Sequence, residues 1–212
     1  MAKCVIFCAG GFCGLAEPLQ ADDFVIAADG GLMHTQSLGI VPNEILGDFD
    51  SLGYMPEGAA VFPVEKDDTD AMLAVRRGLA LGYQEFVLYG ALDGPRLDHT
   101  LANLQVLAFL AQQGASGYLV GNTHIATLVR EASVSFSSDA TGILSVFCLG
   151  EDARGVTLTG LKYPLEKATI TASFPLGVSN HFLGEEATVA VEKGSLWLIY
   201  DRENGLCRRS LC

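Results

Sequence analysis

The feature that most constrains the fold of this chain is a series of short apolar runs, each of which ends at a turn rich in Gly or Asp. Such runs occupy residues 3–8, 24–28, 44–46, 60–64 and 86–89. Helical spacing of apolar residues occurs at residues 70–81 and at residues 97–112, where Leu101, Leu104, Leu107, Ala108 and Ala111 form one stripe. Apolar strands that alternate with helices predict a parallel sheet covered by helices on both faces.

The character of the sequence changes near residue 125. Short β-type runs then follow one another at residues 134–136, 142–149, 155–158, 169–173, 186–191 and 196–200, without a long helical pattern. Residues 192–195 (Glu-Lys-Gly-Ser) predict a tight hairpin between the last two runs. We therefore expect an α/β fold of two domains: residues 1–125 form a Rossmann-like domain with a parallel sheet, and residues 126–212 form a small antiparallel β-sandwich.

The charge of the chain excludes several classes of partner. Its formal net charge is −12 over 212 residues, and −10 of this charge lies in residues 1–125. Such a charge argues against binding nucleic acid through its phosphates and against docking on an anionic membrane. No apolar run approaches the roughly 20 residues of a spanning helix, and the N-terminus lacks a cleavable signal pattern. Cys4 and Cys8 are expected to be buried, Cys13 to be exposed, and the protein to be cytoplasmic.

Acidic residues follow the predicted strands directly, at Asp29, Asp48, Asp50 and residues 67–70, and Asp98 begins the last predicted helix. Parallel sheets bind ligands beyond the carboxyl ends of their strands. Asp48 and Asp50 point the same way in an extended segment, where two carboxylates about 4 Å apart repel by roughly 4 kcal/mol at an effective dielectric near 20. A divalent cation removes this repulsion, and oxygen ligands favour Mg²⁺ over zinc. The alternative is a solvated rim of turn and helix-capping residues.

A magnesium site in turn suggests a phosphate-bearing ligand. Backbone N–H groups at residues 9–11 (Ala-Gly-Gly) and 29–31 (Asp-Gly-Gly) are candidates to hold the phosphates, with Lys66 and Arg96 as cations. The sequence contains neither a Walker A motif nor G-x-G-x-x-G. An ordinary P-loop kinase and a dinucleotide-dependent dehydrogenase are therefore disfavoured.

Four motifs in order resemble those of the thiamine pyrophosphokinase family: Asp-Gly-Gly at residues 29–31, Gly-Asp-Phe-Asp-Ser at 47–51, Lys-Asp-Asp-Thr-Asp at 66–70 and Arg-Leu-Asp-His-Thr-Leu-Ala-Asn at 96–103. Residues 160–165 and 177–180 resemble the thiamine-binding domain of that family. The loop at residues 90–96 is one residue longer than the usual family loop. The resemblance implies a homodimer with thiamine near the subunit interface, and transfer of the pyrophosphoryl group of ATP to thiamine, which gives thiamine diphosphate and AMP.

The resemblance also implies roles for the matching residues. Mg²⁺ would be held by Asp48, Asp50 and Asp70. ATP would be bordered by Asp29, Gly30, Gly31 and Thr69, with Lys66 as a cation. The catalytic group would comprise Asp70, Arg96, Asp98 and His99, with Asp98 as the candidate base. Thiamine would contact Ser179 and Asn180 and stack on Tyr163 or Trp197; the alternative for Trp197 is a core position.

Two other functions stay open from the sequence. The first is a pyrophosphokinase that acts on a different alcohol, such as a pterin. The second is a non-catalytic protein that senses a nucleotide or thiamine. The identity of the accepting alcohol distinguishes a pterin-type pyrophosphokinase from a thiamine pyrophosphokinase. The release of AMP distinguishes both enzymes from a sensor.

Overall fold

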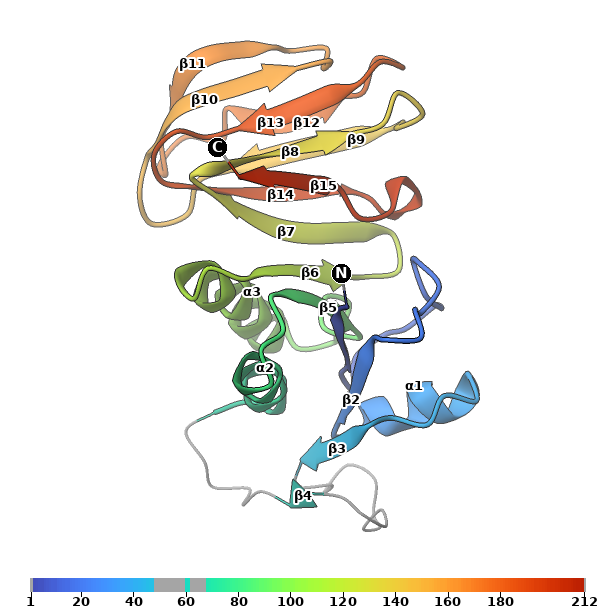
Figure 1. The fold of residues 1–212 in the computed structure, drawn as a ribbon. Helices are drawn as coiled ribbons and strands as arrows, with labels where there is room; N and C mark the ends of the chain where they lie inside the picture. Colours follow the sequence, from blue (N-terminus) through green and yellow to red (C-terminus); the bar gives the residue numbers. More distant parts are fainter. Residues whose placement is uncertain (1, 48–59, 62–67, 212) are drawn as a thin grey trace. The chain divides into compact units, whose positions relative to one another are not determined.

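The computed structural model describes residues 2–47, 60–61 and 68–211, and the chain divides into two compact units (Figure 1). The units are Met1–Asn122 and Thr123–Cys212. The division thus falls after Asn122, whereas the sequence predicted it after residue 125. The difference arises because the first strand of the second unit already begins at His124.

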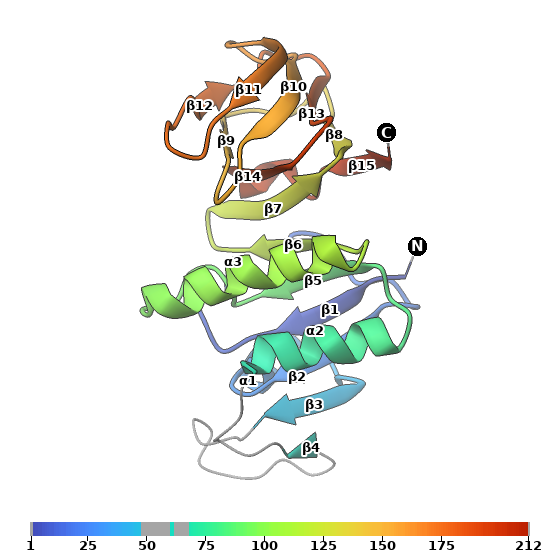
Figure 2. The same ribbon diagram turned by 90° about the vertical axis from the view of Figure 1, so that its left-hand side faces the viewer.

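The first unit is built on parallel strands in the order β6-β5-β1-β2-β3-β4. The strands are β1 (Cys4–Phe7), β2 (Phe24–Ala28), β3 (Glu44–Gly47), β4 (Ala60–Val61), β5 (Glu85–Tyr89) and β6 (Ser116–Val120). The helices are α1 (Gly31–Ser37), α2 (Asp70–Ala80) and α3 (Leu97–Gln112). Helices α2 and α3 cover one face of the sheet and α1 lies on the other, as Figures 1 and 2 show. The prediction of a helix-covered parallel sheet is therefore confirmed.

Close packing between helices and sheet explains which side chains are buried. A Cβ atom at Gly78 of α2 would lie 2.5 Å from the Phe86 ring and 2.8 Å from Cys4 Sγ, so only glycine allows this approach. Cys4 and Cys8 are buried and Cys13 is exposed, as predicted. The described helices include none that is long and apolar enough to cross a membrane.

Helix α3 buries the predicted apolar stripe only in part, because Leu107 is buried, Leu104, Ala108 and Ala111 are half-buried, and Leu101 is exposed. Its buried residues are Val106, Leu107 and Leu110, whereas Leu101 is 55% exposed. The helix packs where Gly117 of β6 leaves room, because a Cβ atom there would lie 2.6 Å from Leu110 and 2.8 Å from Leu107. Helix α3 is apolar over much of its surface, so its spacing alone does not select one face.

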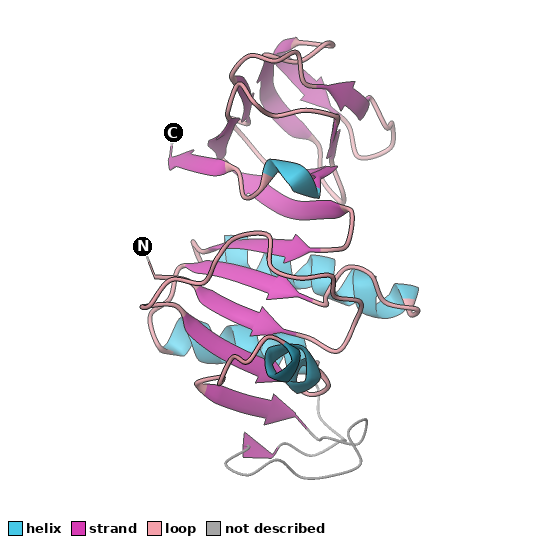
Figure 3. Ribbon diagram, turned by 90° about the vertical axis from the view of Figure 1, so that its right-hand side faces the viewer, coloured by secondary structure: helices cyan, strands magenta, loops and turns pink. Residues whose placement is uncertain are grey.

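The second unit consists of two antiparallel sheets, with strand orders β12-β9-β14-β7 and β11-β10-β13-β8-β15 (Figure 3). The strands are β7 (His124–Arg130), β8 (Ala132–Phe136), β9 (Ile143–Phe147), β10 (Ala153–Thr159), β11 (Leu165–Ile170), β12 (Gly177–His181), β13 (Ala187–Ala190), β14 (Ser195–Asp201) and β15 (Arg208–Leu211), and a 3₁₀ helix covers Arg202–Asn204. The rings of Phe136 and Tyr200, one from each sheet, meet edge to face at 4.9 Å. Trp197 is buried in the same unit, as its core interpretation requires. The finer classes, Rossmann-like and β-sandwich, stay predictions.

The predicted hairpin at residues 192–195 is wrong. Strand β13 pairs with β8 and β10, and β14 pairs with β7 and β9, so the two strands belong to different sheets. Lys193 instead exchanges backbone hydrogen bonds with Arg154, at 2.9 and 3.1 Å, and Gly194 O accepts from Glu131 N–H at 3.2 Å. The segment does link two strands, but a turn does not specify which strands pair across it.

Candidate active site

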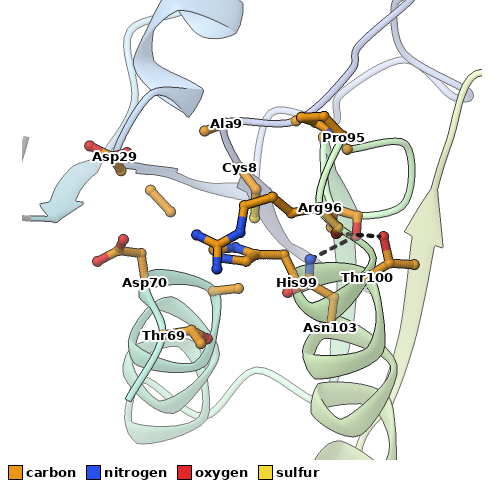
Figure 4. Close-up of a pocket in the computed structure, with 16 residues that line it drawn as sticks. Cys8, Ala9, Asp29, Thr69, Asp70, Pro95, Arg96, His99, Thr100 and Asn103 are labelled. Carbon is orange, nitrogen blue, oxygen red and sulfur yellow. Dashed lines mark hydrogen bonds between the residues drawn. The ribbon is translucent and has the colours of Figure 1, made fainter. Parts of the chain in front are cut away.

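A cavity of about 390 Å³ lies in the first unit, at the carboxyl ends of β1, β2 and β5 (Figure 4). The N-terminal ends of α2 and α3 form its other walls. The lining consists of Cys8, Ala9, Gly10, Ala28, Asp29, Thr69, Asp70, Ala71, Gly90, Ala91, Gly94, Pro95, Arg96, His99, Thr100 and Asn103. The position agrees with the expectation that ligands bind beyond the carboxyl ends of parallel strands.

Two carboxylates form one side of the cavity, Asp29 after β2 and Asp70 at the start of α2 (Figure 4). Asp29 has a φ angle of 47° and its N–H donates to Leu46 O at 2.8 Å. Gly47, the last described residue before Asp48, lies so close that a Cβ atom there would be 3.1 Å from the Asp29 backbone. The carboxylate of Asp70 is stabilised at a helix N-terminus by the helix dipole.

The rest of the Lys-Asp-Asp-Thr-Asp motif has structural roles where it is described. Thr69 caps α2, because its Oγ1 accepts from Met72 N–H at 3.2 Å. The carboxylate of Asp68 pairs with Arg76 Nε at 2.9 Å, and the Arg76 guanidinium lies 5.0 Å from the centre of the Phe109 ring. The motif therefore contributes Thr69 and Asp70 to the cavity, while Asp68 is engaged by an arginine.

The predicted metal ligands are described only in part. Asp48, Asp50 and Lys66 lie outside the described residues. Among the described residues, no three His, Cys, Asp or Glu side chains are grouped closely enough to hold a metal ion. Asp29 and Asp70 nevertheless bring carboxylate oxygens to the same cavity, and such oxygens are the ligands that Mg²⁺ prefers. These two carboxylates are ligand types that suit Mg²⁺, and the magnesium site itself stays a prediction.

Arg96 and His99 extend into the cavity from the start of α3 (Figure 4). The Arg96 guanidinium holds Asp98 by two hydrogen bonds, Nη2–Oδ2 at 2.6 Å and Nε–Oδ1 at 3.2 Å, and both side chains are 64% exposed. The hydrogen bond from Arg96 lowers the pKa of Asp98, and the same contact raises the pKa of Arg96. Asp98 does not line the cavity. A carboxylate with a lowered pKa is a weaker base, so Asp98 must leave Arg96 to act as one.

The predicted phosphate contacts of the Ala-Gly-Gly segment need correction. Gly10 N–H donates to Gly90 O and Gly11 N–H donates to Asp93 O, each at 2.9 Å, so neither N–H is bare. Gly30 and Gly31 are absent from the lining of the cavity. Gly31 instead brings α1 against β1, where a Cβ atom would lie 1.9 Å from Phe7 O. Gly10, Gly11 and Gly31 therefore allow chain segments to approach one another closely.

The predicted thiamine residues lie in the second unit. Asn180 is only 3% exposed, and its Oδ1 accepts from the N–H groups of Tyr163 and His181, both at 2.9 Å. Its Nδ2 donates to Tyr163 O at 2.8 Å. Ser179 is exposed with a φ angle of 56°, and the Tyr163 ring is largely exposed with Lys162 Nζ 5.4 Å from its centre. The amide of Asn180 therefore holds the Tyr163 backbone.

Several lining residues, among them Cys8, Thr100 and Asn103, were not predicted from the sequence to bind a ligand or to act in catalysis. Asn103 lies four residues after His99 and so shares its helix face, which was a usable signal. Asn103 Nδ2 donates to Ala91 O at 2.7 Å. Burial raises the pKa of the Cys8 thiol to about 12, with a smaller effect from Asp70, so the thiol stays neutral. No motif marked Cys8, which follows directly from the end of β1.

Fold and cavity together define a class: a parallel α/β unit with carboxylates and an arginine at its strand ends, followed by an antiparallel β unit. Residues 15–119 match the family model described as "Thiamin pyrophosphokinase, catalytic domain", and residues 131–196 match "Thiamin pyrophosphokinase, vitamin B1 binding domain". The chain is 31% identical over 183 residues to the thiamine pyrophosphokinase of Bacillus subtilis (strain 168), covering 82% of this chain and 85% of that protein.

Solved structures agree with this relationship. The crystal structure of thiamine pyrophosphokinase from Bacillus subtilis superimposes with a TM-score of 0.81 at 26% identity, over 95% of this chain and 99% of that one. A thiamin pyrophosphokinase family protein from Enterococcus faecalis gives a TM-score of 0.79 at 26% identity, over 95% and 99% of the two chains. The chain belongs to the thiamin pyrophosphokinase family, as the motifs predicted, and its relatives bear the names of kinases.

Proposed function

We propose that this protein is a thiamine pyrophosphokinase that transfers the pyrophosphoryl group of Mg·ATP to the hydroxyl group of thiamine. The supporting observation is the cavity at the strand ends, where Asp29 and Asp70 lie opposite Arg96 and His99. Carboxylates on one wall suit a metal-bound triphosphate, and an arginine on the other suits phosphate oxygens. The products would be thiamine diphosphate and AMP.

The reaction forms one bond and breaks one. The thiamine oxygen bonds to the β-phosphorus, the bond from that phosphorus to the oxygen of the α-phosphate breaks, and AMP leaves. Phosphoryl transfer of this kind depends on positioning and on stabilising charge more than on covalent chemistry. The Arg96 guanidinium would stabilise charge on the transferred phosphates. The hydroxyl proton would pass to a base, for which Asp98 is the candidate once it separates from Arg96.

The carboxylates of Asp48, Asp50 and Asp70 would hold the magnesium ion, with Asp29 beside them. Mg²⁺, when bound, would neutralise charge on the phosphates of ATP and restrict their orientation. Thr69 would border the nucleotide from the first turn of α2, where its capping contact fixes the start of the helix. Gly30, Gly31 and Lys66 stay predicted nucleotide-binding residues.

Thiamine recognition belongs to the second unit in this proposal. The exposed Tyr163 ring would stack on the cationic ring system of thiamine, and Ser179 would contact its aminopyrimidine. Asn180 would act by holding the Tyr163 backbone.

A homodimer with thiamine near the subunit interface is part of the same proposal. Strand β12 lies at one end of its sheet within the second unit. Val178 of this strand and Leu176 just before it expose apolar side chains that a second copy would cover. We also propose a cytoplasmic location, because the cysteines in the described part of the chain are all free thiols. Sedimentation of the purified protein tests the dimer directly.

The decisive experiment is a product assay with Mg·ATP and thiamine. We expect AMP and thiamine diphosphate in equal amounts. Release of ADP would refute pyrophosphoryl transfer, and turnover with a pterin-type alcohol but not thiamine would change the acceptor. Binding of both ligands with no AMP released would identify a sensor instead of an enzyme.

A further inference from the structure

The loop at residues 90–96, which joins β5 to α3, is held in place from three directions. From α3, Asn103 Nδ2 donates to Ala91 O at 2.7 Å and Thr100 Oγ1 donates to Leu92 O at 3.2 Å. From the loop after β1, Gly10 N–H donates to Gly90 O at 2.9 Å. The third set of contacts converges on one residue, Asp93.

Asp93 connects the loop to two other segments at once. Its backbone carbonyl accepts from Gly11 N–H at 2.9 Å, and its carboxylate Oδ2 accepts from the N–H of Asn122, just after β6. Two glycines contact Asp93 so closely that a larger residue would clash with it. A Cβ atom at Gly11 would lie 2.7 Å from Asp93 O, and one at Gly121 would lie 2.5 Å from Asp93 Oδ2.

We propose that Asp93 is a positioning residue, whose carboxylate anchors the loop to the Asn122 N–H and thereby holds Arg96 at the cavity. This inference rests on the proposed function, because it assigns Asp93 to the presentation of Arg96 to the transferred phosphates. Arg96 follows Asp93 by only three residues, and the intervening Gly94 and Pro95 both line the cavity.

The short segment between Asp93 and Arg96 couples the position of Arg96 to that of Asp93. Proline fixes its own φ angle and restricts the residue before it, so Pro95 limits the conformations of Gly94 and itself. A shift of Asp93 therefore moves the start of α3, where Arg96 is the residue that precedes the first turn. Without the anchor, Arg96 would be less often in the position from which it contacts the transferred phosphates in the transition state.

The test is a double-mutant cycle on the full chain, with Asp93→Ala, Arg96→Ala and the double variant. We expect Asp93→Ala to lower kcat by about tenfold, the size of one hydrogen bond to a charged group, with a smaller change in the KM for ATP. In the Arg96→Ala background, Asp93→Ala should lower kcat by less than about twofold, because Asp93 is proposed to affect kcat by positioning Arg96. Equal losses in both backgrounds would overturn the proposal, since a merely structural role is additive.

Two further variants sharpen the result. Asp93→Asn keeps an oxygen that can accept from Asn122 N–H, so it should retain most of the activity. Asp22→Ala removes an exposed carboxylate of the same unit, outside the loop and the cavity, and should leave kcat unchanged. If Asp93→Ala fails to fold, Gly121→Ala replaces it in the cycle, because its Cβ displaces the same carboxylate.

A second measurement does not depend on catalysis. Hydrogen exchange of the Gly10 and Gly11 amides, followed by mass spectrometry, reports on the contacts between the two loops. We expect faster exchange at these amides in Asp93→Ala than in Asp93→Asn or Asp22→Ala. Unchanged exchange would overturn the anchor even in an active enzyme. Faster exchange in a protein that makes no thiamine diphosphate would refute the proposed function and leave the anchor standing.

Discussion

The buried amide of Asn180 offers the sharpest test of how the second unit contributes to function. Its three hydrogen bonds hold the backbone of Tyr163 and the N–H of His181, at 2.8 to 2.9 Å. Each such bond contributes about 1 kcal/mol net, and a buried N–H left without an acceptor adds about 1–3 kcal/mol. Asn180→Ala should therefore lower the free energy of unfolding by about 4–6 kcal/mol. For a chain of this size the melting temperature should fall by about 8–24 °C.

The functional effect of Asn180→Ala should be specific. Because the amide acts on the backbone of Tyr163, we expect a KM for thiamine raised about tenfold with little change in the KM for ATP or in kcat. Steady-state kinetics below the melting transition, with urea unfolding in parallel, measure both effects. Asn180→Asp would place a carboxylate oxygen against Tyr163 O at this buried position, so it should destabilise the protein at least as much as Asn180→Ala.

Asn204 provides a matched control. It also makes three hydrogen bonds through its amide, two with the Thr141 backbone and one to Asp201 O, at 2.9 to 3.1 Å. Asn204→Ala should therefore destabilise the second unit without changing the KM for thiamine. An equal rise in that KM for both variants would show that loss of stability, and not the Tyr163 contact, accounts for the effect. An unchanged KM in Asn180→Ala would refute the positioning role.

Three further predictions concern the first unit. Gly31→Ala should lower the free energy of unfolding, measured in urea, by more than about 3 kcal/mol. The added Cβ would lie 1.9 Å from Phe7 O, a backbone atom that cannot move away. Thr69→Ala should cost about 1 kcal/mol through the lost helix cap, and Thr69→Ser should restore most of it; thermal melts compare the two. The lowered pKa of Asp98 means that its contribution to stability is present above its ordinary pKa and lost as pH falls through the lowered value. Carboxyl NMR titration should show that Arg96→Ala returns the Asp98 pKa toward its ordinary value.

Sequence reasoning worked best where one pattern has one physical cause. An apolar run that ends in Gly or Asp marks the carboxyl end of a buried strand, so the sequence alone assigned Asp29 and Asp70 to one edge of the sheet. The helix Leu97–Gln112 was also predicted with its observed bounds. In each case the signal is local, since strand ends and helix periods are set by neighbouring residues.

Sequence reasoning failed where distant segments decide the outcome. The N–H groups of Gly10 and Gly11 looked available for phosphate, yet carbonyls some eighty residues further along the chain accept from both. The turn at residues 192–195 looked like a hairpin, yet its flanking strands pair elsewhere. Each error concerns the hydrogen-bond or strand partner of a segment, and such partners depend on the tertiary structure as a whole.

Removal of the divalent cation tests the electrostatic reasoning behind the site. The cavity presents Asp29 and Asp70 against Arg96, and the charge of that arginine is already paired with Asp98. A bare triphosphate would then face net repulsion, worth about 2 kcal/mol for one pair of charges 8 Å apart at an effective dielectric near 20. We therefore expect ATP to bind at least tenfold more weakly in EDTA than with Mg²⁺, measured by calorimetry. Asp70→Asn should reduce the difference between the ATP affinities with and without Mg²⁺. The substitution removes a carboxylate that repels the bare nucleotide and that would also help to hold the ion. Equal affinity for ATP with and without the cation would contradict the interpretation of the acidic strand ends as a metal-dependent nucleotide site.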